Sequence, residues 1–115
     1  MNYNTAHQLA REIEQSEEAR EYRRLKEIVE ESDTTRALLK EYRRSQMMLQ
    51  MASLGKTQLP QEEMTRFSQL SSLLYAGTDT SAFLLAEMRL QQMMADVFGL
   101  LSKASGIPME LPGLS

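Results

Sequence analysis

The stretch Leu38–Met51, LLKEYRRSQMMLQM, carries apolar side chains on two sides of one predicted helix. At about 100° per residue, one side is an apolar stripe within an arc of roughly 100°: Leu38, Leu39, Tyr42 and Leu49. Met47, Met48 and Met51 gather on roughly the opposite side. A helix needs one such face to join its own core. The methionine side is therefore predicted to be an interface, for self-association or partner docking, with ordinary core packing as the alternative.

This stretch belongs to the second of four predicted helices. The first covers about residues 4–31, which contain no Gly or Pro. The second covers about residues 33–53, with Asp33 as its cap and Gly55 as its stop signal. Because the connection between the two helices is short, we expect them to form a long antiparallel helical hairpin.

The apolar side of the first predicted helix drifts along its length, and Asn4 or Thr5 can cap its start. Its early apolar residues share one side and its later ones lie nearly opposite, at about 100° per residue: Leu9 and Ile13, then Tyr22, Leu25 and Val29. Either the two ends of this helix pack against different surfaces or the helix is kinked.

Two further helices are predicted. The third opens at Pro60, which a first helical turn tolerates, and closes at Gly77. Its stripe has three- and four-residue spacing: Met64, Phe67, Leu70 and Leu74. The fourth covers about residues 80–104, with Asp79 as its cap. Three residues add apolar bulk around its first half and are further candidate interface residues: Leu84, Leu85 and Met88.

The composition indicates one all-α domain. The chain has 115 residues, a formal net charge of −3, no cysteine and no tryptophan. We expect a single domain over residues 1–106 and an extended tail over 107–115, which contains Pro108 and Pro112. No stretch approaches the roughly 20 apolar residues of a membrane span, and the N-terminus lacks the apolar run of a signal peptide. We therefore expect a cytoplasmic protein without a membrane partner.

The sequence offers little for chemistry. His7 is the only histidine, and the absence of cysteine excludes thiolate sites. A Glu-x-x-His pair, as di-iron bundles require, does not occur. Gly55-Lys56-Thr57 matches only the end of a phosphate-binding loop. We predict no catalytic, metal-binding or cofactor-binding residue, and hence no enzyme and no cofactor.

Basic residues provide a candidate polar partner surface on the first two predicted helices: Arg20, Arg23, Arg24, Lys40, Arg43 and Arg44. In a hairpin that turns near Ser32, the first three approach the last two. Such a patch suits RNA or an acidic protein. The alternative is an ordinary solvated face, because Glu17, Glu21, Glu27 and Glu41 interleave with these cations at helical spacing.

The order and spacing of these residues resemble the YlbF/YmcA family of small helical proteins, often labelled control-of-competence regulators, over about residues 6–104. The resemblance rests on four groups of residues: Ala6, Leu9, Ala10, Ile13, Ser16, Glu17 and Tyr22; Asp33, Leu38, Leu39, Tyr42 and Gln46; Gly55, Leu70 and Leu74; and FLLAEMRL at 83–90 with Met94 and Val97.

The resemblance implies a non-catalytic, oligomer-forming helical protein of Gram-positive bacteria. Its characterised relatives act in a complex that influences competence, sporulation and biofilm formation, in part by directing ribonuclease Y to transcripts. Some hold iron–sulfur clusters through cysteines, which this chain lacks.

We therefore expect a cytoplasmic regulatory adaptor that works as a helical homo-oligomer, a dimer or higher, in an oligomeric bundle. Its expected partners are a second copy, paralogous family members or ribonuclease Y. The alternative is an RNA-binding or ribonuclease-accessory protein that uses the basic residues of the hairpin.

Overall fold

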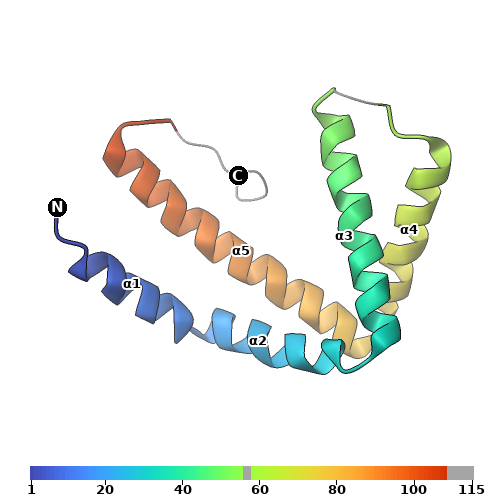
Figure 1. The fold of residues 1–115 in the computed structure, drawn as a ribbon, viewed down its shortest axis with the longest axis horizontal. Coiled ribbons are helices and arrows are strands. Elements are labelled where there is room, and N and C mark those ends of the chain that lie inside the picture. Colours follow the sequence, from blue (N-terminus) through green and yellow to red (C-terminus); the bar gives the residue numbers. More distant parts are fainter. Residues whose placement is uncertain (56–57, 109–115) are drawn as a thin grey trace. The chain divides into compact units, whose positions relative to one another are not determined.

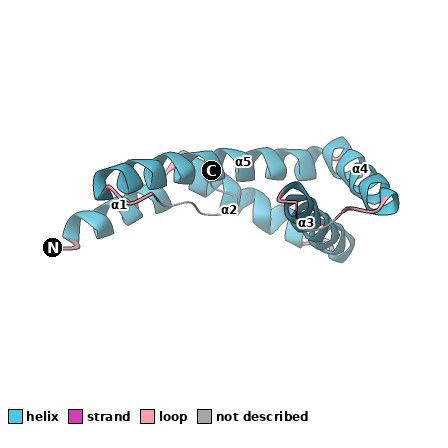
Figure 2. Cartoon of the chain, turned by 90° about the horizontal axis from the view of Figure 1, so that it is seen from above, coloured by secondary structure: helices cyan, strands magenta, loops and turns pink. Residues whose placement is uncertain are grey.

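The computed structural model describes residues 1–55 and 58–108, and its secondary structure there is entirely α-helical, as predicted (Figure 1). Within these ranges there are five helices: α1 (Asn4–Glu14), α2 (Glu17–Glu30), α3 (Asp33–Ser53), α4 (Gln61–Ala76) and α5 (Thr78–Ser105). Figure 2 shows these helices joined by loops, without a strand in the described ranges. The chain divides into two compact units, one of residues 1–26 with 83–115 and one of residues 27–82. The predicted domain boundaries, 1–106 and 107–115, stay a prediction.

The predicted helix over residues 4–31 is divided in two at Gln15 and Ser16, which raises the helix count from four to five. The Ser16 hydroxyl donates to the Ile13 carbonyl at 2.6 Å and accepts from the Ala19 backbone N–H at 3.1 Å. Ser16 therefore caps α2, and two acidic residues in its first turn, Glu17 and Glu18, favour a helix start there. This break accounts for the drift of apolar positions along the stretch.

We expect Ser16→Ala to lower the free energy of unfolding by about 1 kcal/mol, because the N–H of Ala19 loses its acceptor. Urea denaturation followed by far-ultraviolet circular dichroism measures this change. Ser72→Ala is the matched control, because Ser72 is an exposed residue inside α4 and alanine favours a helix interior. Equal losses in the two variants would show that the Ser16 cap does not stabilise the protein.

The predicted caps of the first two predicted helices are wrong by one or more residues. The cap of α3 is Ser32, whose hydroxyl accepts from the Thr35 N–H at 3.2 Å, while Asp33 is the first helical residue. At the start of α1, the side chain of Asn2 accepts from the N–H of Asn4 at 2.8 Å. In both places a residue just outside the helix supplies the oxygen, because the N–H groups of the first turn point back along the chain.

The ends of α3 and α4 lie close to the predicted positions. Gly55 follows α3 with φ at 76°, a conformation that favours glycine, and confirms the predicted stop. α4 ends at Ala76, before Gly77. α5 begins at Thr78 rather than near Thr80, so Asp79 lies in its first turn instead of capping it.

The unit of residues 27–82 is built on a helical hairpin of α3 and α4, which lie side by side in Figure 1. The rings of Tyr42 and Phe67 stack with centroids 5.2 Å apart and planes 10° from parallel. Glu41 accepts two hydrogen bonds from the Arg66 guanidinium, at 3.0 and 2.6 Å. The core residues of these helices are buried: Leu39, Tyr42, Leu70 and Leu74. The sequence analysis did not predict this hairpin of α3 and α4, and the predicted hairpin of residues 4–31 with 33–53 stays a prediction, because residues 1–26 belong to the other unit.

In the other unit, α2 packs along the N-terminal part of α5. Tyr22 stacks on Phe83 with centroids 5.4 Å apart, and the small residues Ala19 and Ala86 are both buried. α1 has no buried residue, and Leu101 near the end of α5 is exposed. After α5, Gly106 has a φ of 76° and Ile107 is exposed. Residues 109–115 of the predicted extended tail lie outside the described residues.

Candidate functional site

The predicted methionine interface lies on the outward side of α3. Met47 is 63% exposed and Met51 48%, whereas Met48 is half-buried at the edge of that side. The opposite side of α3 carries the buried residues Leu39 and Tyr42. α3 therefore uses one face for the hairpin core and leaves a second apolar face uncovered by its own unit.

Leu54 extends this uncovered face, and the sequence analysis did not include it. It is the C-cap residue of α3 and is 71% exposed. It follows Met47 by seven residues and Met51 by three, which is the spacing of one helical face. That spacing was the signal available in the sequence.

The second group of predicted interface residues lies on α5. Leu85 and Met88 are exposed, so they are available for a contact. Leu84 is only 4% exposed and therefore does not belong to an exposed surface. Phe83 and Ala86 are also buried, and since Leu84 lies nearly opposite Ala86 at about 100° per residue, α5 is buried on more than one side near its start.

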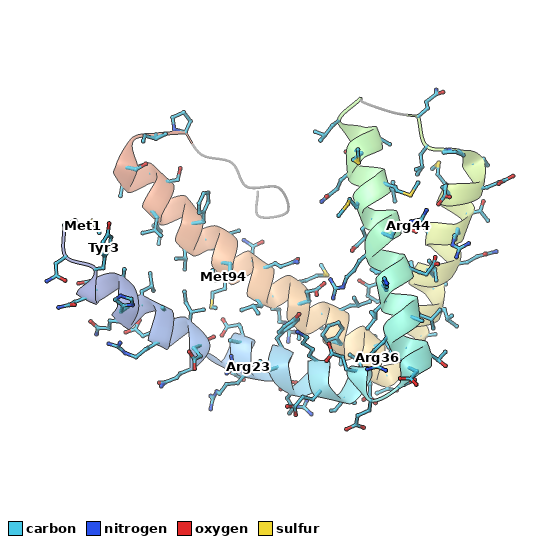
Figure 3. The ribbon with its side chains drawn as sticks, in the orientation of Figure 1. Met1, Tyr3, Arg23, Arg36, Arg44 and Met94 are labelled. Carbon is cyan, nitrogen blue, oxygen red and sulfur yellow. The ribbon has the colours of Figure 1, made fainter. Side chains whose placement is uncertain are left out.

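The basic residues of α2 have local partners. Figure 3 labels Arg23 on α2. Its guanidinium donates to the Glu14 carbonyl at 2.7 Å and so satisfies a carbonyl at the end of α1. Arg24 donates two hydrogen bonds to the Glu21 carboxylate, at 3.1 and 2.7 Å. Arg20 is exposed. Two of the three arginines that were predicted to meet a partner thus stabilise the α1–α2 segment itself.

The basic residues of α3 belong to the other unit. Lys40, Arg43 and Arg44 are exposed, and Figure 3 shows Arg44 on α3. Because Arg20, Arg23 and Arg24 lie in a different unit from these three, the predicted joint patch stays a prediction. Arg66, which the sequence analysis did not single out, pairs with Glu41 and so neutralises one acidic neighbour of the α3 cations.

A hollow of about 300 Å³ lies between α2 and α5, lined by Glu17, Glu18, Glu21, Ala86 and Arg89. The hydrogen bond from Arg24 lowers the pKa of Glu21, burial opposes this shift, and the charges of Arg24 and Arg89 add to it. A carboxyl with a lowered pKa is ionised at neutral pH and is a poor proton donor. The hollow is therefore a charged surface, and Glu21 is not a candidate proton donor.

Neither a metal site nor a membrane span is found in residues 1–55 and 58–108. No group of three or more His, Cys, Asp or Glu side chains there is arranged to hold a metal ion. No helix in the same ranges is both long and apolar enough to cross a bilayer. His7 is an exposed residue of α1.

Comparison with known proteins identifies relatives along nearly the whole chain. The profile of the family described as control of competence regulator ComK, YlbF/YmcA, matches residues 3–104. A UPF0342 protein of Halothermothrix orenii is 30% identical over 95 residues, which are 83% of this chain and 80% of that one. A UPF0342 protein of Symbiobacterium thermophilum is 27% identical over 96% of both chains.

A third relative, a UPF0342 protein of Desulfitobacterium hafniense, is 28% identical over 89% of this chain and 82% of its own. No solved structure matches. The family is named for the control of a regulator, which suggests a regulatory role. The extent of the match and the helices that carry it show that this chain, which has no cysteine, belongs to the YlbF/YmcA family.

Proposed function

We propose that this protein is a non-catalytic regulatory adaptor of the cytoplasm that acts through protein–protein contacts as a homo-oligomer. The observation that carries the proposal is an apolar stripe on α5 that its own unit covers at only one end. Phe83 is 2% exposed, Met94 and Val97 are half-buried, and Leu101 is 56% exposed. These residues share one side of the helix at about 100° per residue.

α1, which belongs to the same unit, supports the same proposal. It is amphipathic, with Leu9 and Ile13 on one side, yet none of its residues is buried. In Figure 1, α1 and the C-terminal half of α5 run apart from each other. A second copy could cover both apolar sides. Burying four or five such side chains contributes on the order of 6–12 kcal/mol before the costs of association.

We expect the wild-type protein to be a dimer or higher oligomer at micromolar concentration, and Leu101→Glu to shift it to the monomer. A glutamate at this position places a charge in the proposed contact, where burial without a partner is costly. Size-exclusion chromatography with light scattering measures the molar mass, and circular dichroism verifies that the helices are retained.

Leu73→Glu is the matched control, because Leu73 is also 56% exposed and lies on α4 in the other unit. We expect this variant to keep the wild-type mass. A monomeric wild-type protein, or equal dissociation by both variants, would contradict the proposed contact.

The process that we propose is the regulation of competence, from the family description, with sporulation and biofilm formation as the processes that the family resemblance adds. In such a process, paralogous family members or ribonuclease Y would be the proteins that the adaptor brings together. Co-purification from the native host with mass spectrometry tests this part of the proposal.

The alternative function is RNA binding or assistance to a ribonuclease. Lys40 and Arg44 favour it, because both are exposed and neither forms an ion pair with any described residue. This alternative predicts an affinity for RNA that falls steeply with salt concentration and is lost in a Lys40→Glu/Arg44→Glu variant. The adaptor function predicts association that tolerates salt.

A further inference from the structure

The exposed side of α3 joins two features that the sequence analysis treated as separate surfaces. Five residues share this side within an arc of roughly 80°, at about 100° per residue, and we call them the outer strip: Lys40, Arg44, Met47, Met51 and Leu54. At 1.5 Å per residue the strip is about 21 Å long. All five residues belong to the unit of residues 27–82, and all are exposed.

The strip has a cationic end and an apolar end. Lys40 and Arg44 have no ion-pair partner in the described ranges, unlike Arg36, which pairs with Asp33 one turn before the strip. Met47, Met51 and Leu54 follow directly and are each about half exposed or more. Uncovered apolar side chains next to available cations are typical of a surface that binds another molecule.

The strip does not complement itself. In a two-fold contact, the same patch of both copies meets. With the two α3 helices antiparallel and the whole strips overlapping, Lys40 and Arg44 would meet Met51 and Leu54, so that cations would be buried against apolar groups. With the helices parallel, cations would face cations. A second copy is therefore a poor occupant of the whole strip.

RNA would occupy only the cationic end of the strip. Phosphates would pair with Lys40 and Arg44, but the apolar end offers no further cation to continue a backbone contact. Met47 and Met51 are flexible and polarizable, which suits them to adapt to apolar side chains of a protein partner. The occupant that matches both ends carries acidic residues at one end and apolar residues at the other.

We propose that the outer strip binds an amphipathic helix of a different protein, with carboxylates against Lys40 and Arg44 and apolar side chains against Met47, Met51 and Leu54. Helices that dock in this way use anchors at three- and four-residue spacing. This proposal rests on the proposed function as an adaptor, but it does not depend on self-association, because the apolar stripe of α5 lies in the other unit.

The test uses fluorescent alanine-based helical peptides and the full-length protein, with binding followed by fluorescence anisotropy. Each peptide carries two glutamates and three leucines at the spacing of the strip, in the two possible orders from N- to C-terminus. We expect one order to bind saturably. Arg44→Glu and Met51→Glu should each weaken it about tenfold or more, which is about 1.4 kcal/mol. Arg20→Glu, an exposed charge reversal in the other unit, should not.

A charge swap provides the decisive measurement. A peptide with lysines in place of the two glutamates should bind the Lys40→Glu/Arg44→Glu variant and not the wild-type protein. Thermal unfolding of each variant verifies that it is folded. If neither order of the acidic peptide binds the folded wild-type protein, or if the swap restores nothing, the proposal is overturned.

Two other outcomes would also overturn it in favour of a different occupant. One is binding of an oligouridine or an anionic phospholipid vesicle through Lys40 and Arg44, with an affinity that Met47→Ser/Met51→Ser does not change. The other is dissociation of the wild-type oligomer by Met51→Glu, which would make the strip a contact between copies. If the Leu101→Glu monomer still binds the peptide, the outer strip is supported whatever the outcome for self-association.

Discussion

Phe83→Ala is expected to lower the free energy of unfolding by about 3–5 kcal/mol, close to the whole stability of a marginal domain. Phe83 is 2% exposed and stacks on Tyr22, with ring centroids 5.4 Å apart, so that it joins α5 to α2. Alanine would leave a cavity and remove the stacked pair. Urea denaturation followed by circular dichroism measures the change.

Phe98→Ala is the control, because Phe98 lies on the same helix and is only half-buried. We expect a clearly smaller loss there, since less of its surface is removed from water. A double-mutant cycle with Tyr22→Ala isolates the contribution of the stacked pair, which we expect to be about 0.5–1.5 kcal/mol. Equal losses for Phe83→Ala and Phe98→Ala would contradict the packing of α5 on α2.

Leu74→Ala is expected to lower the free energy of unfolding by about 2–5 kcal/mol. Leu74 is 2% exposed and lies on the side of α4 that carries Leu70 and Phe67 against α3. Truncation leaves a cavity in the hairpin core. The same denaturation experiment measures this loss.

Its neighbour Leu73 is a close control, because it is also a leucine of α4 but is 56% exposed. We expect Leu73→Ala to change the free energy of unfolding by less than about 1 kcal/mol. Each variant replaces one leucine by alanine in the same turn of α4. The difference between their free energies of unfolding therefore reports the difference in burial. A larger loss for Leu73→Ala than for Leu74→Ala would mean that α4 is rotated relative to the structure.

Local features of the sequence predicted most helix boundaries. Helix formers, Gly55 and Pro60 placed α3 and the start of α4 within a residue or two of the observed limits. The break at Ser16 also has a local signal in the sequence, a serine followed by two glutamates. The sequence analysis gave a kink as one alternative but did not place it at Ser16, because the stretch contains no Gly or Pro and a serine can occupy a helix interior as well as a cap.

Helix pairing was harder to predict than helix position. The stacked rings of Tyr42 and Phe67 and the ion pair of Glu41 with Arg66 join α3 to α4, and the sequence analysis did not predict this pairing. Several apolar residues of each helix could have formed either core. Leu84 illustrates the same difficulty, because its apolar character did not distinguish an exposed contact from the buried position that it occupies.

By itself, the sequence determined the helical class, the family and the excess of apolar surface around Met47 and Met51, because helix propensity, caps and spacing act within a few residues. Only the tertiary structure decided which face of each helix is covered, because that depends on contacts between residues far apart in the chain. It turned one side of α3 toward α4 and left Lys40, Arg44, Met47, Met51 and Leu54 together on the other. The methionine surface and the cations of α3 thereby became one strip.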